Sequence, residues 1–474
     1  MIFLYGAPAS GKSTLGKTLS KGLGARFVDL DEAIVRKAGA SIPEIFASSG
    51  EASFRDIESK TLKETIASSA SSSSMPSSRR SAFTIVSLGG GTLLREDNRR
   101  LCEENGAVFC IDSPSDEELA RRIGSAAGAR PLGNKARERA PHYASFHNRI
   151  AAWFELENSL VVVGNGIASP IISGVPVVAD ATVEGLWAGR LGISPLATIP
   201  SGESFKTPQT VMGLWSAFAN GGLGRKDVVA ALGGGVTGDL TGFAAATFMR
   251  GIDWINIPTT LLSMVDASTG GKTGCDLPEG KNLAGAFHSP RVVAIDADFL
   301  ETLPPHLLSA GRAEMVKHEI IGGLEPSGNT AVPTPAEIAR NLAVKVGVVR
   351  DDPFERTGRR ILLNCGHTVA HAVETLSEYR VSHGEAVAIG CVEEARLAVR
   401  MGLAAPSWPD ELAARFAAWN LPVTLPQGIA MSDMAPVMKR DKKRAGGIVT
   451  FALPCGWGDV RGVPVDIDKE VIQG

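Results

Sequence analysis

The sequence predicts an α/β protein made of two α/β regions followed by a mostly helical region. Short apolar runs that end in glycine and lead into helical patterns recur through the first part of the chain, which is typical of βα units on a parallel sheet. Beyond about residue 302 such runs become rare and helical periodicity dominates. The length of 474 residues allows two or three domains. We expect domains at residues 1–155, 156–303 and 304–474, with an unstructured Ser-rich surface insertion at 68–78.

Composition and charge exclude several classes of partner. The net charge of -3 gives no electrostatic reason to expect nucleic acid or an anionic membrane surface. No run of eighteen apolar residues is present, so we expect no membrane-spanning helix. The six cysteines are scattered without short pairwise spacings, which fits a reducing compartment. We therefore expect a cytoplasmic protein that acts on small molecules.

The first domain begins with a phosphate-binding motif. Gly6–Ser13 matches G-x-x-x-x-G-K-[ST], follows an apolar run and precedes a helical pattern. In such a loop the backbone N–H groups surround a polyphosphate, the lysine reaches the terminal phosphates and the hydroxyl binds Mg²⁺. The motif predicts an ATP and Mg²⁺ site, against the alternative of an ordinary glycine turn. Its residues are Gly11, Lys12, Ser13 and Thr14.

Charged residues follow this loop in an ordered series. Asp29 and Asp31 end a strand pattern two residues apart, so both side chains point the same way and can serve a metal and a hydroxyl nucleophile. Arg55 and Arg139 could bind a small carboxylate through two hydrogen bonds. Each residue alone is more often a solvated surface charge.

Together with Gly89–Gly91 and Arg130, the series resembles shikimate kinase over most of residues 1–150. The resemblance implies that Asp29 helps to hold Mg²⁺ with Ser13 and that Asp31 positions the shikimate 3-hydroxyl. Asp31 and Lys12, which reaches the terminal phosphates, would be the catalytic residues. The resemblance also implies shikimate binding by Arg55, Gly90, Gly91 and Arg139, and a lid contact of Arg130 with ATP. The lid is short and the last strand and helix of the family are expected to be missing, so an ATP-binding module without kinase activity is the alternative.

The second region combines glycines and cations. Gly233–Asp239 follows an apolar strand pattern and opens a helix, a geometry that suits a pyrophosphate. Asp180 ends a strand, where an acid commonly meets a ribose hydroxyl. Further cations, hydroxyls and glycines stand among apolar residues between 202 and 282, and buried lysines require an anionic ligand or partner.

The third region contains a candidate metal site. His367 and His371 are four residues apart on one helical face, so spacing alone suggests that both bind Zn²⁺. The alternative is a pair of surface or packed histidines. Five of the eight histidines fall between 306 and 383, close to Glu314, which favours a metal site.

Residues 156–474 resemble 3-dehydroquinate synthase through motifs such as GGGVTGD, GGKTG, GKNLAGAF, AEMVKH, LNCGHTVAH and SHGEAV. The resemblance changes the metal assignment that spacing suggests. It implies that Glu314, His367 and His383 bind Zn²⁺ or Co²⁺ while His371 faces the substrate. It implies NAD binding by Asp180, Glu203, Lys206, Gly234, Gly235, Val236, Asp239, Thr259, Thr260, Lys281, Asn282 and Thr302.

The implied substrate is 3-deoxy-D-arabino-heptulosonate 7-phosphate, which is oxidised at C5 by NAD⁺, loses phosphate, is reduced again and closes to 3-dehydroquinate. Asp266, Lys272, Lys317 and His371 would be catalytic; the residues implied to bind this substrate are Arg250, Asp266, Lys272, Asn282, Lys317, Lys345, Arg360, Asn364, His371 and Lys442. By the same resemblance Arg250 reaches the phosphate in a neighbouring subunit, which implies a homodimer through the synthase half. A metal- and NAD-dependent alcohol dehydrogenase of the glycerol-dehydrogenase type is the alternative.

Overall fold

The computed structural model describes the chain as two compact units. The described residues are 1–71, 83–112, 137–328, 330–441 and 448–472. The first unit is Met1–Ile257 with Thr273–Asp298, and the second is Pro258–Lys272 with Phe299–Gly474. No helix in these stretches is long and apolar enough to cross a membrane. The predicted α/β class with a mostly helical C-terminal part is confirmed.

The first half of unit 1 is a parallel sheet with a helix after most strands. The strands lie in the order β2-β3-β1-β4-β5, and all four neighbouring pairs are parallel. They are β1 (Ile2–Gly6), β2 (Arg26–Asp29), β3 (Thr84–Ser87), β4 (Ala107–Ile111) and β5 (Arg149–Leu156), with helices α1 (Lys12–Leu23), α2 (Leu30–Ala38), α3 (Ile42–Ser71), α4 (Glu96–Asn105) and α7 (Ala140–Ala144). Strand β1 is completely buried, as expected for the centre of a parallel sheet.

Two expectations for this half are wrong. Residues 68–71 are not an unstructured insertion, because they form the last turn of α3; residues 72–78 lie outside the described part. The last strand of the kinase-like fold is present as β5, which pairs with the end of β4. Further along, β5 is in contact with α1, because Thr18 of that helix donates a hydrogen bond to Glu155 of the strand at 2.9 Å. The sequence between the two halves looks too short for another strand. The strand is present nevertheless, because β5 pairs with β4 of the first half and with β6 of the second.

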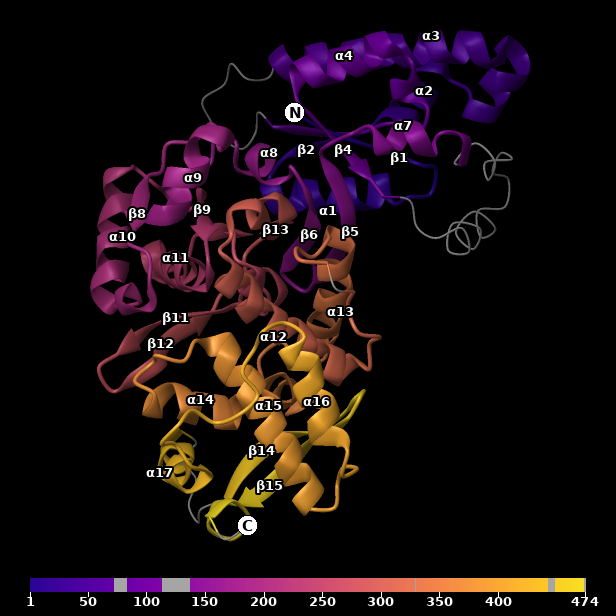
Figure 1. The fold of residues 1–474 in the computed structure, drawn as a ribbon. Helices are drawn as coiled ribbons and strands as arrows, with labels where there is room; N and C mark the ends of the chain where they lie inside the picture. Colours follow the sequence, from indigo (N-terminus) through magenta and orange to yellow (C-terminus); the bar gives the residue numbers. More distant parts are fainter. Residues whose placement is uncertain (72–82, 113–136, 329, 442–447, 473–474) are drawn as a thin grey trace. The chain divides into compact units, whose positions relative to one another are not determined.

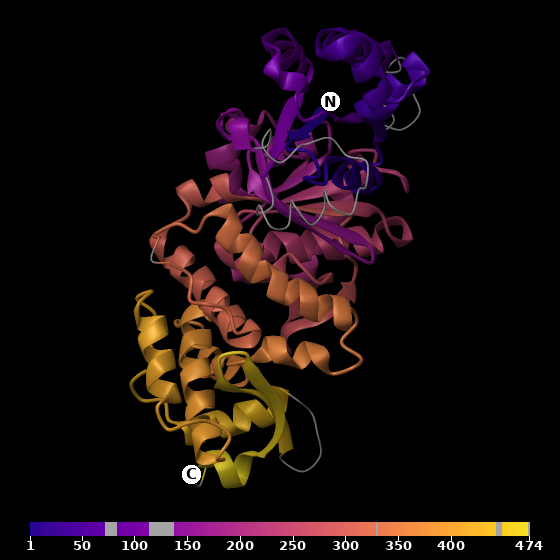
Figure 2. The same ribbon diagram turned by 90° about the vertical axis from the view of Figure 1, so that its right-hand side faces the viewer.

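Strand β5 also joins the second half of unit 1. It forms an antiparallel hairpin with β6, and the order continues β6-β13-β10-β9-β7-β8 within one eleven-stranded sheet (Figure 2). These strands are β6 (Ser159–Asn165), β7 (Val177–Asp180), β8 (Ala197–Ile199), β9 (Val228–Gly233), β10 (Asp253–Pro258) and β13 (Val292–Asp296). The accompanying elements are α8 (Ala168–Ile172), α9 (Ala181–Leu191), α10 (Pro208–Asn220), α11 (Gly235–Thr247) and the separate hairpin β11 (Lys272–Leu277) and β12 (Gly280–Phe287).

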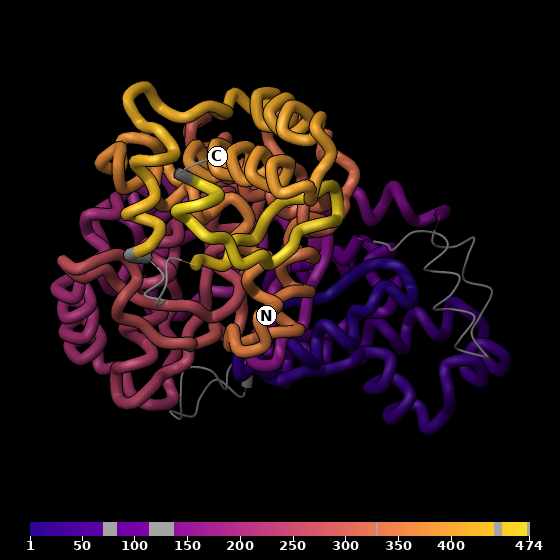
Figure 3. The backbone as a smooth tube through the Cα atoms, turned by 90° about the horizontal axis from the view of Figure 1, so that it is seen from below, coloured from indigo at the N-terminus to yellow at the C-terminus, as the bar shows by residue number. Residues whose placement is uncertain are grey.

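Unit 2 is mostly helical, with one C-terminal hairpin. Strands β14 (Ile448–Gly456) and β15 (Asp459–Asp466) are antiparallel, and β14 packs against α15 (Figure 3). The helices are α12 (Pro305–Gly322), α13 (Pro335–Asp351), α14 (His367–Leu376), α15 (His383–Arg400), α16 (Trp408–Ala417) and α17 (Met431–Asp441). Helices α12, α14 and α15 share one apolar core, which includes Val316, Val369 and Val387.

The contact between α14 and α15 depends on two glycines. A Cβ atom on Gly390 would lie 2.0 Å from the carbonyl oxygen of Gly366, which real Cβ atoms do not tolerate. Gly366 itself has φ of 77° and its Cβ would meet the Cys391 sulfur at 2.5 Å. The two backbones therefore touch directly, and the close approach holds the start of α14 against the middle of α15.

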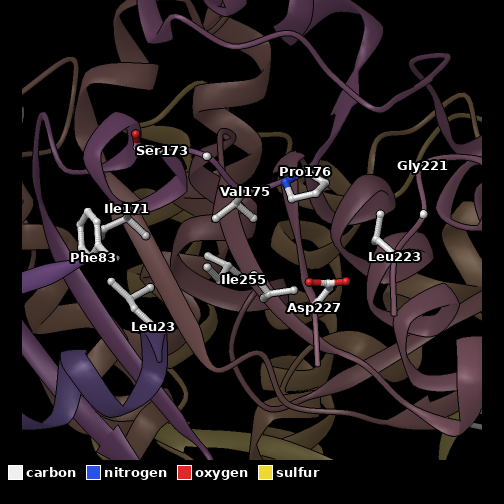
Figure 4. Close-up of a pocket in the computed structure, with 13 residues that line it drawn as sticks. Leu23, Phe83, Ile171, Ser173, Val175, Pro176, Gly221, Leu223, Asp227 and Ile255 are labelled. Carbon is white, nitrogen blue, oxygen red and sulfur yellow. The ribbon is translucent and has the colours of Figure 1, made fainter. Parts of the chain in front are cut away.

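A cavity of about 260 Å³ lies in unit 1, beside the end of α1 (Figure 4). Its lining includes Leu23, Pro176, Leu223 and Ile255, and its carboxylate is Asp227. Pro176 and Asp227 immediately precede β7 and β9, so the cavity is at the edge where these strands begin. The glycine-rich loops of this sheet follow the ends of their strands, and the cavity plays no part in the sites described below.

Candidate active sites

The phosphate-binding loop links β1 to α1. Gly11 stands immediately before α1 and has φ of 91°. A residue with a Cβ adopts this left-handed backbone conformation only at a cost in free energy. Lys12 is almost fully buried and donates hydrogen bonds to the carbonyls of Gly6 at 3.1 Å and Ala7 at 2.7 Å. Burial lowers the pKa of Lys12 to about 8. A phosphate at the start of α1 would stabilise its ammonium form.

The predicted Mg²⁺ pair is in contact. The Ser13 hydroxyl donates to Asp29 Oδ2 at 2.5 Å, while Asp29 Oδ1 accepts the backbone N–H groups of Asp31 and Glu32 and so begins α2. The orientation of Asp29 is therefore fixed by the helix that it caps. Thr14, in contrast, is exposed on the first turn of α1.

The predicted shikimate-binding residues converge around the loop after β3. Arg55 is held by Glu58 at 2.7 Å and by Glu51 at 3.3 Å. Arg139 donates a hydrogen bond to the Gly90 carbonyl at 3.1 Å. A Cβ on Gly91 would lie 2.6 Å from Arg55 Nη2, and one on Gly89 would lie 3.3 Å from Asp31 Oδ1. The arginines and Asp31 thus surround the same short glycine loop.

Two predicted residues cannot be placed. Arg130 and Lys442 lie outside the described residues, and most of the lid before Arg139 does too.

The predicted NAD residues of unit 1 form a polar cluster beside α11. Lys206 is paired with Asp239 at 2.7 Å and donates to Asn282 at 2.6 Å. Lys281 is 3.9 Å from Glu203. Gly234 precedes α11, and Gly235 and Val236 form its first turn, so their N–H groups point out of the helix start.

Asp180 lies at the end of β7, the parallel neighbour of β9, at the same edge of the sheet where β9 leads into Gly234. Its Oδ1 accepts the N–H groups of Thr182 and Val183 and the hydroxyl of Ser201 at 2.7 Å. The remaining predicted hydroxyls belong to unit 2. Thr259 is buried and its hydroxyl has no partner among the described residues, Thr260 accepts from the N–H of Ser263, and Thr302 donates to Phe299.

Glu314, His367 and His383 come together in unit 2. Their ligand atoms lie within 4.8 Å of one another. Glu314 Oε1 is 3.6 Å from Nε2 of His367 and 3.5 Å from Nε2 of His383. The Glu314 side chain is fully buried, and its Oε1 accepts no hydrogen bond from the described residues. A buried carboxylate that faces two imidazole nitrogens is an arrangement that a divalent cation completes.

The opposite nitrogens of both histidines have oxygen partners. His367 Nδ1 lies 3.1 Å from the Cys365 carbonyl, and His383 Nδ1 lies 3.5 Å from Glu374. Metal-binding histidines usually have such a partner, which orients the ring. Burial lowers the pKa of His367 to about 3, which keeps it in the neutral form that binds metals. Burial opposes charge on His383 as well, but the carboxylates of Glu314 and Glu374 raise its pKa to about 10 in the metal-free chain.

Asp266 lies beside this triad on a single π-helical turn, Ser263–Ala267. Lys345 is 2.7 Å from its carboxylate, and Lys317 and His318 are each 3.7 Å away. Lys317 also contacts Glu314. Although burial opposes it, the charges of Lys317 and Lys345 hold the pKa of Asp266 well below its usual range. Two ammonium groups and a carboxylate are therefore concentrated next to the candidate metal ligands.

The other predicted substrate residues are more dispersed. Arg360 is buried and donates to the Gly270 carbonyl at 3.3 Å and the Pro353 carbonyl at 2.8 Å. Lys272 pairs with Glu355 at 2.8 Å and is half exposed. Asn364 ends the short helix before α14, and the ring of His371 meets that of His367 edge-on at 5.6 Å. Arg250 belongs to unit 1, in an exposed turn.

Comparison with known proteins identifies both parts of the chain. Residues 8–162 match the family model of shikimate kinase. Residues 196–310 and 311–444 match those of the N-terminal and C-terminal parts of 3-dehydroquinate synthase.

Curated relatives agree with this division. The 3-dehydroquinate synthase of Symbiobacterium thermophilum is 43% identical over 317 residues, which cover 63% of this chain and 88% of the relative. The chain belongs to the 3-dehydroquinate synthase family. It also carries a shikimate kinase domain at its N-terminus. The 3-dehydroquinate synthase of a Synechococcus species is 45% identical over 293 residues, which cover 58% of this chain and 79% of the relative.

Solved structures similar to the synthase half include two other synthases. One is a 2-epi-5-epi-valiolone synthase from Streptomyces hygroscopicus subsp. jinggangensis with NAD⁺ and Zn²⁺ bound, with TM-score 0.61 and 28% identity over 69% of this chain and 97% of that one. The other is a 2-deoxy-scyllo-inosose synthase complexed with carbaglucose-6-phosphate, NAD⁺ and Co²⁺, with TM-score 0.57 and 25% identity over 67% and 97%.

Sequence reasoning missed several residues that support these sites. Glu58 stands in the charged series of the sequence, three residues after Arg55, but the sequence alone assigned it no role. The Trp153 ring, which would lie 2.5 Å from a Cβ on Gly11, comes from a strand thought to be absent. Glu374 gave no signal, since its importance depends on which side chain the fold brings to it. His318 belongs to the AEMVKH motif, but the sequence assigned it no role for the same reason.

Proposed function

We propose that the chain is a bifunctional enzyme of aromatic precursor synthesis. The synthase half converts 3-deoxy-D-arabino-heptulosonate 7-phosphate to 3-dehydroquinate and phosphate with NAD and Zn²⁺ or Co²⁺. The kinase domain transfers the terminal phosphate of ATP, with Mg²⁺, to the 3-hydroxyl of shikimate. The convergence of Glu314, His367 and His383 is the observation that carries the first activity.

The residues around this triad suit the proposed synthase substrate. A divalent cation held by Glu314, His367 and His383 supplies a Lewis acid for the C5 oxygen, and NAD supplies a hydride acceptor that the later reduction restores. Lys317 and Asp266 are placed to orient substrate hydroxyls. Burial lowers the pKa of Lys345, and an anionic substrate would stabilise its charged form.

Further cations would bind the substrate phosphate and carboxylate. Arg360 and Lys272 lie in the same unit as the triad, together with Asn364 and His371. Guanidinium and ammonium groups in a site that excludes water bind oxyanions strongly. For NAD we propose the polar cluster at Lys206 and Asp239, the start of α11, and the Asp180 carboxylate.

The kinase proposal rests on the pre-formed contacts of its loop. Lys12 is held over the loop, Ser13 and Asp29 are paired, and Arg55 and Arg139 surround the glycines after β3. Phosphoryl transfer needs mainly positioning and charge neutralisation, which these groups provide. Asp31, close to the same glycines, would orient the hydroxyl nucleophile.

The decisive test of the synthase activity is the stoichiometry of phosphate and NADH. The full-length chain, loaded with Zn²⁺ or Co²⁺ and a catalytic amount of NAD⁺, should release phosphate from the heptulosonate phosphate over many turnovers. Absorbance at the NADH band should stay flat, because the cofactor is regenerated. A matched arm treated with a chelator should release none. NADH accumulation in step with product would instead identify a metal- and NAD-dependent alcohol dehydrogenase, the alternative reading.

We also propose a cytoplasmic homodimer formed through the synthase half. Met249 and Arg250 both adopt left-handed backbone angles, with φ of 51° and 69°, which is unusual for two adjacent residues with side chains. Such a turn holds the Arg250 side chain outward, where it could reach a second copy. Sedimentation of the full-length chain should give two copies per particle, and a monomer that is fully active would contradict the dimer.

A further inference from the structure

A buried carboxylate on α15 accepts hydrogen bonds from the start of α14, the helix that carries the candidate metal ligand His367. Glu394 is 0% exposed. Its Oε2 accepts the N–H of Gly366 at 2.8 Å, and its Oε1 accepts those of Thr368 at 3.1 Å and Val369 at 3.2 Å. Glu394 belongs to neither the triad nor the substrate cluster.

These three N–H groups belong to the start of α14, where a helix offers no carbonyl oxygen of its own to accept them. The first N–H groups of a helix have no carbonyl partner within it, and α14 has glycine before its first residue, so no local side chain caps it. Gly366, Thr368 and Val369 are buried, so water does not replace the missing partner. Buried N–H groups without a hydrogen-bond partner destabilise a fold. A carboxylate also interacts favourably with the positive end of the helix dipole.

The capped residues flank His367. His367 is the first residue of α14, and its Nδ1 can only donate to the Cys365 carbonyl oxygen, 3.1 Å away. The backbone on both sides of His367 is therefore held by the hydrogen bonds that the N–H groups of residues 366, 368 and 369 donate to the Glu394 carboxylate. These hydrogen bonds fix the Cα–Cβ direction of His367, and with it the side to which its imidazole points.

Helix α15 also supplies the second histidine. His383 is its first residue, and Glu394 is eleven residues further along, about 16 Å away at 1.5 Å per residue. The direct contact of Gly390 with Gly366 lies between these two points. One helix therefore holds His383 directly and His367 through the start of α14.

We infer that Glu394 is a positioning residue for metal binding, which sets the orientation of His367 toward Glu314 and His383 through the three N–H groups at the start of α14. The inference rests on the proposed metal site. Its consequence is that a carboxylate without contact to the ion determines how tightly and in what geometry the ion is held. Supporting groups of this kind change metal affinity by about 10–100-fold in other metal sites.

The test compares Glu394→Ala and Glu394→Gln with changes at the adjacent carboxylate. Glu393 is on the same helix, is 7% exposed and pairs with Arg396, and among the described residues it accepts no hydrogen bond from the start of α14. Glu393→Gln and Glu393→Ala are therefore the matched controls. Each full-length variant is freed of metal with a chelator and titrated with Co²⁺, while the visible absorption of the bound ion reports its ligand geometry.

The expected result is a graded one. Glu394→Ala should weaken Co²⁺ binding about 10–100-fold and change the visible spectrum. Glu394→Gln should fall between it and the unchanged chain, because an amide oxygen replaces Oε1 while its NH₂ group opposes the Gly366 N–H. In the metal-free chain, amide hydrogen exchange at Thr368 and Val369 should accelerate in both Glu394 variants and stay unchanged in the Glu393 variants.

The outcomes separate the inference from the proposed function. If the unchanged chain binds no Co²⁺ at the triad, the proposed metal site itself is wrong. If it binds Co²⁺ and the Glu394 variants match it in affinity and spectrum, the positioning role is overturned. Should Glu394→Ala not fold, the isosteric Glu394→Gln and its exchange rates decide in the same way.

Discussion

Replacing Glu314 by glutamine is expected to lower synthase turnover by about 10³-fold, or about 4 kcal/mol of transition-state stabilisation, while shikimate phosphorylation continues. The Glu314 carboxylate faces the Nε2 atoms of both His367 and His383. Glutamine keeps the volume but removes the charge that binds a divalent cation. It also leaves the fully buried Lys317 without one of its two carboxylate partners.

The loss of a buried charge partner can itself destabilise a protein by about 3–5 kcal/mol, so stability must be measured separately. Glu319→Gln is the matched control. Glu319 lies on the same helix, is equally buried and pairs with Arg415 at 2.9 Å, away from the triad. Both variants should be destabilised in urea unfolding, but only Glu314→Gln should lose bound metal by elemental analysis. A Glu314→Gln chain that keeps one metal per subunit and full phosphate release would show that the ion is held elsewhere.

The metal site shows how far sequence reasoning reaches. Spacing places His367 and His371 on one face of a helix, and it cannot say which of them meets a third ligand. The resemblance to the synthase family selects His383 instead. The fold brings His383 to Glu314 because α15 closely approaches α12 at Gly384, where a Cβ would lie 2.3 Å from the Cα atom of Ala310. A contact between two backbones leaves little trace in a sequence beyond glycine itself.

The sheet shows the corresponding limit for architecture. The alternation of strand and helix patterns predicts two α/β halves, and their parallel strands follow from it. It does not predict that β5, besides its hairpin with β6, also pairs with β4, since β4 is distant in the chain. The same reason hides Glu394 and Glu374, whose partners lie on another helix.

Replacing Lys12 by alanine is expected to reduce shikimate-dependent ATP turnover by about 10³-fold, again about 4 kcal/mol, and to leave phosphate release by the synthase half unchanged. The Lys12 ammonium is held by the Gly6 and Ala7 carbonyls, at the start of the helix where the loop wraps a polyphosphate. Alanine removes the positive charge from the terminal phosphates. Since transfer depends on neutralising that charge, turnover should fall more than ATP affinity.

Lys17→Ala is the matched control, because Lys17 is on the next turn of α1, is exposed and lies only 3.9 Å from Glu32 in a surface ion pair. It should retain the kinase rate. Two results would point in different directions. If Lys12→Ala keeps its shikimate-dependent turnover, the loop is not where phosphate is transferred. If the unchanged chain binds ATP but shows no such turnover, the N-terminal domain is an ATP-binding module that has lost transfer, and the defect must be sought in the acceptor side, at Asp31, Arg55 and Arg139, or in the lid.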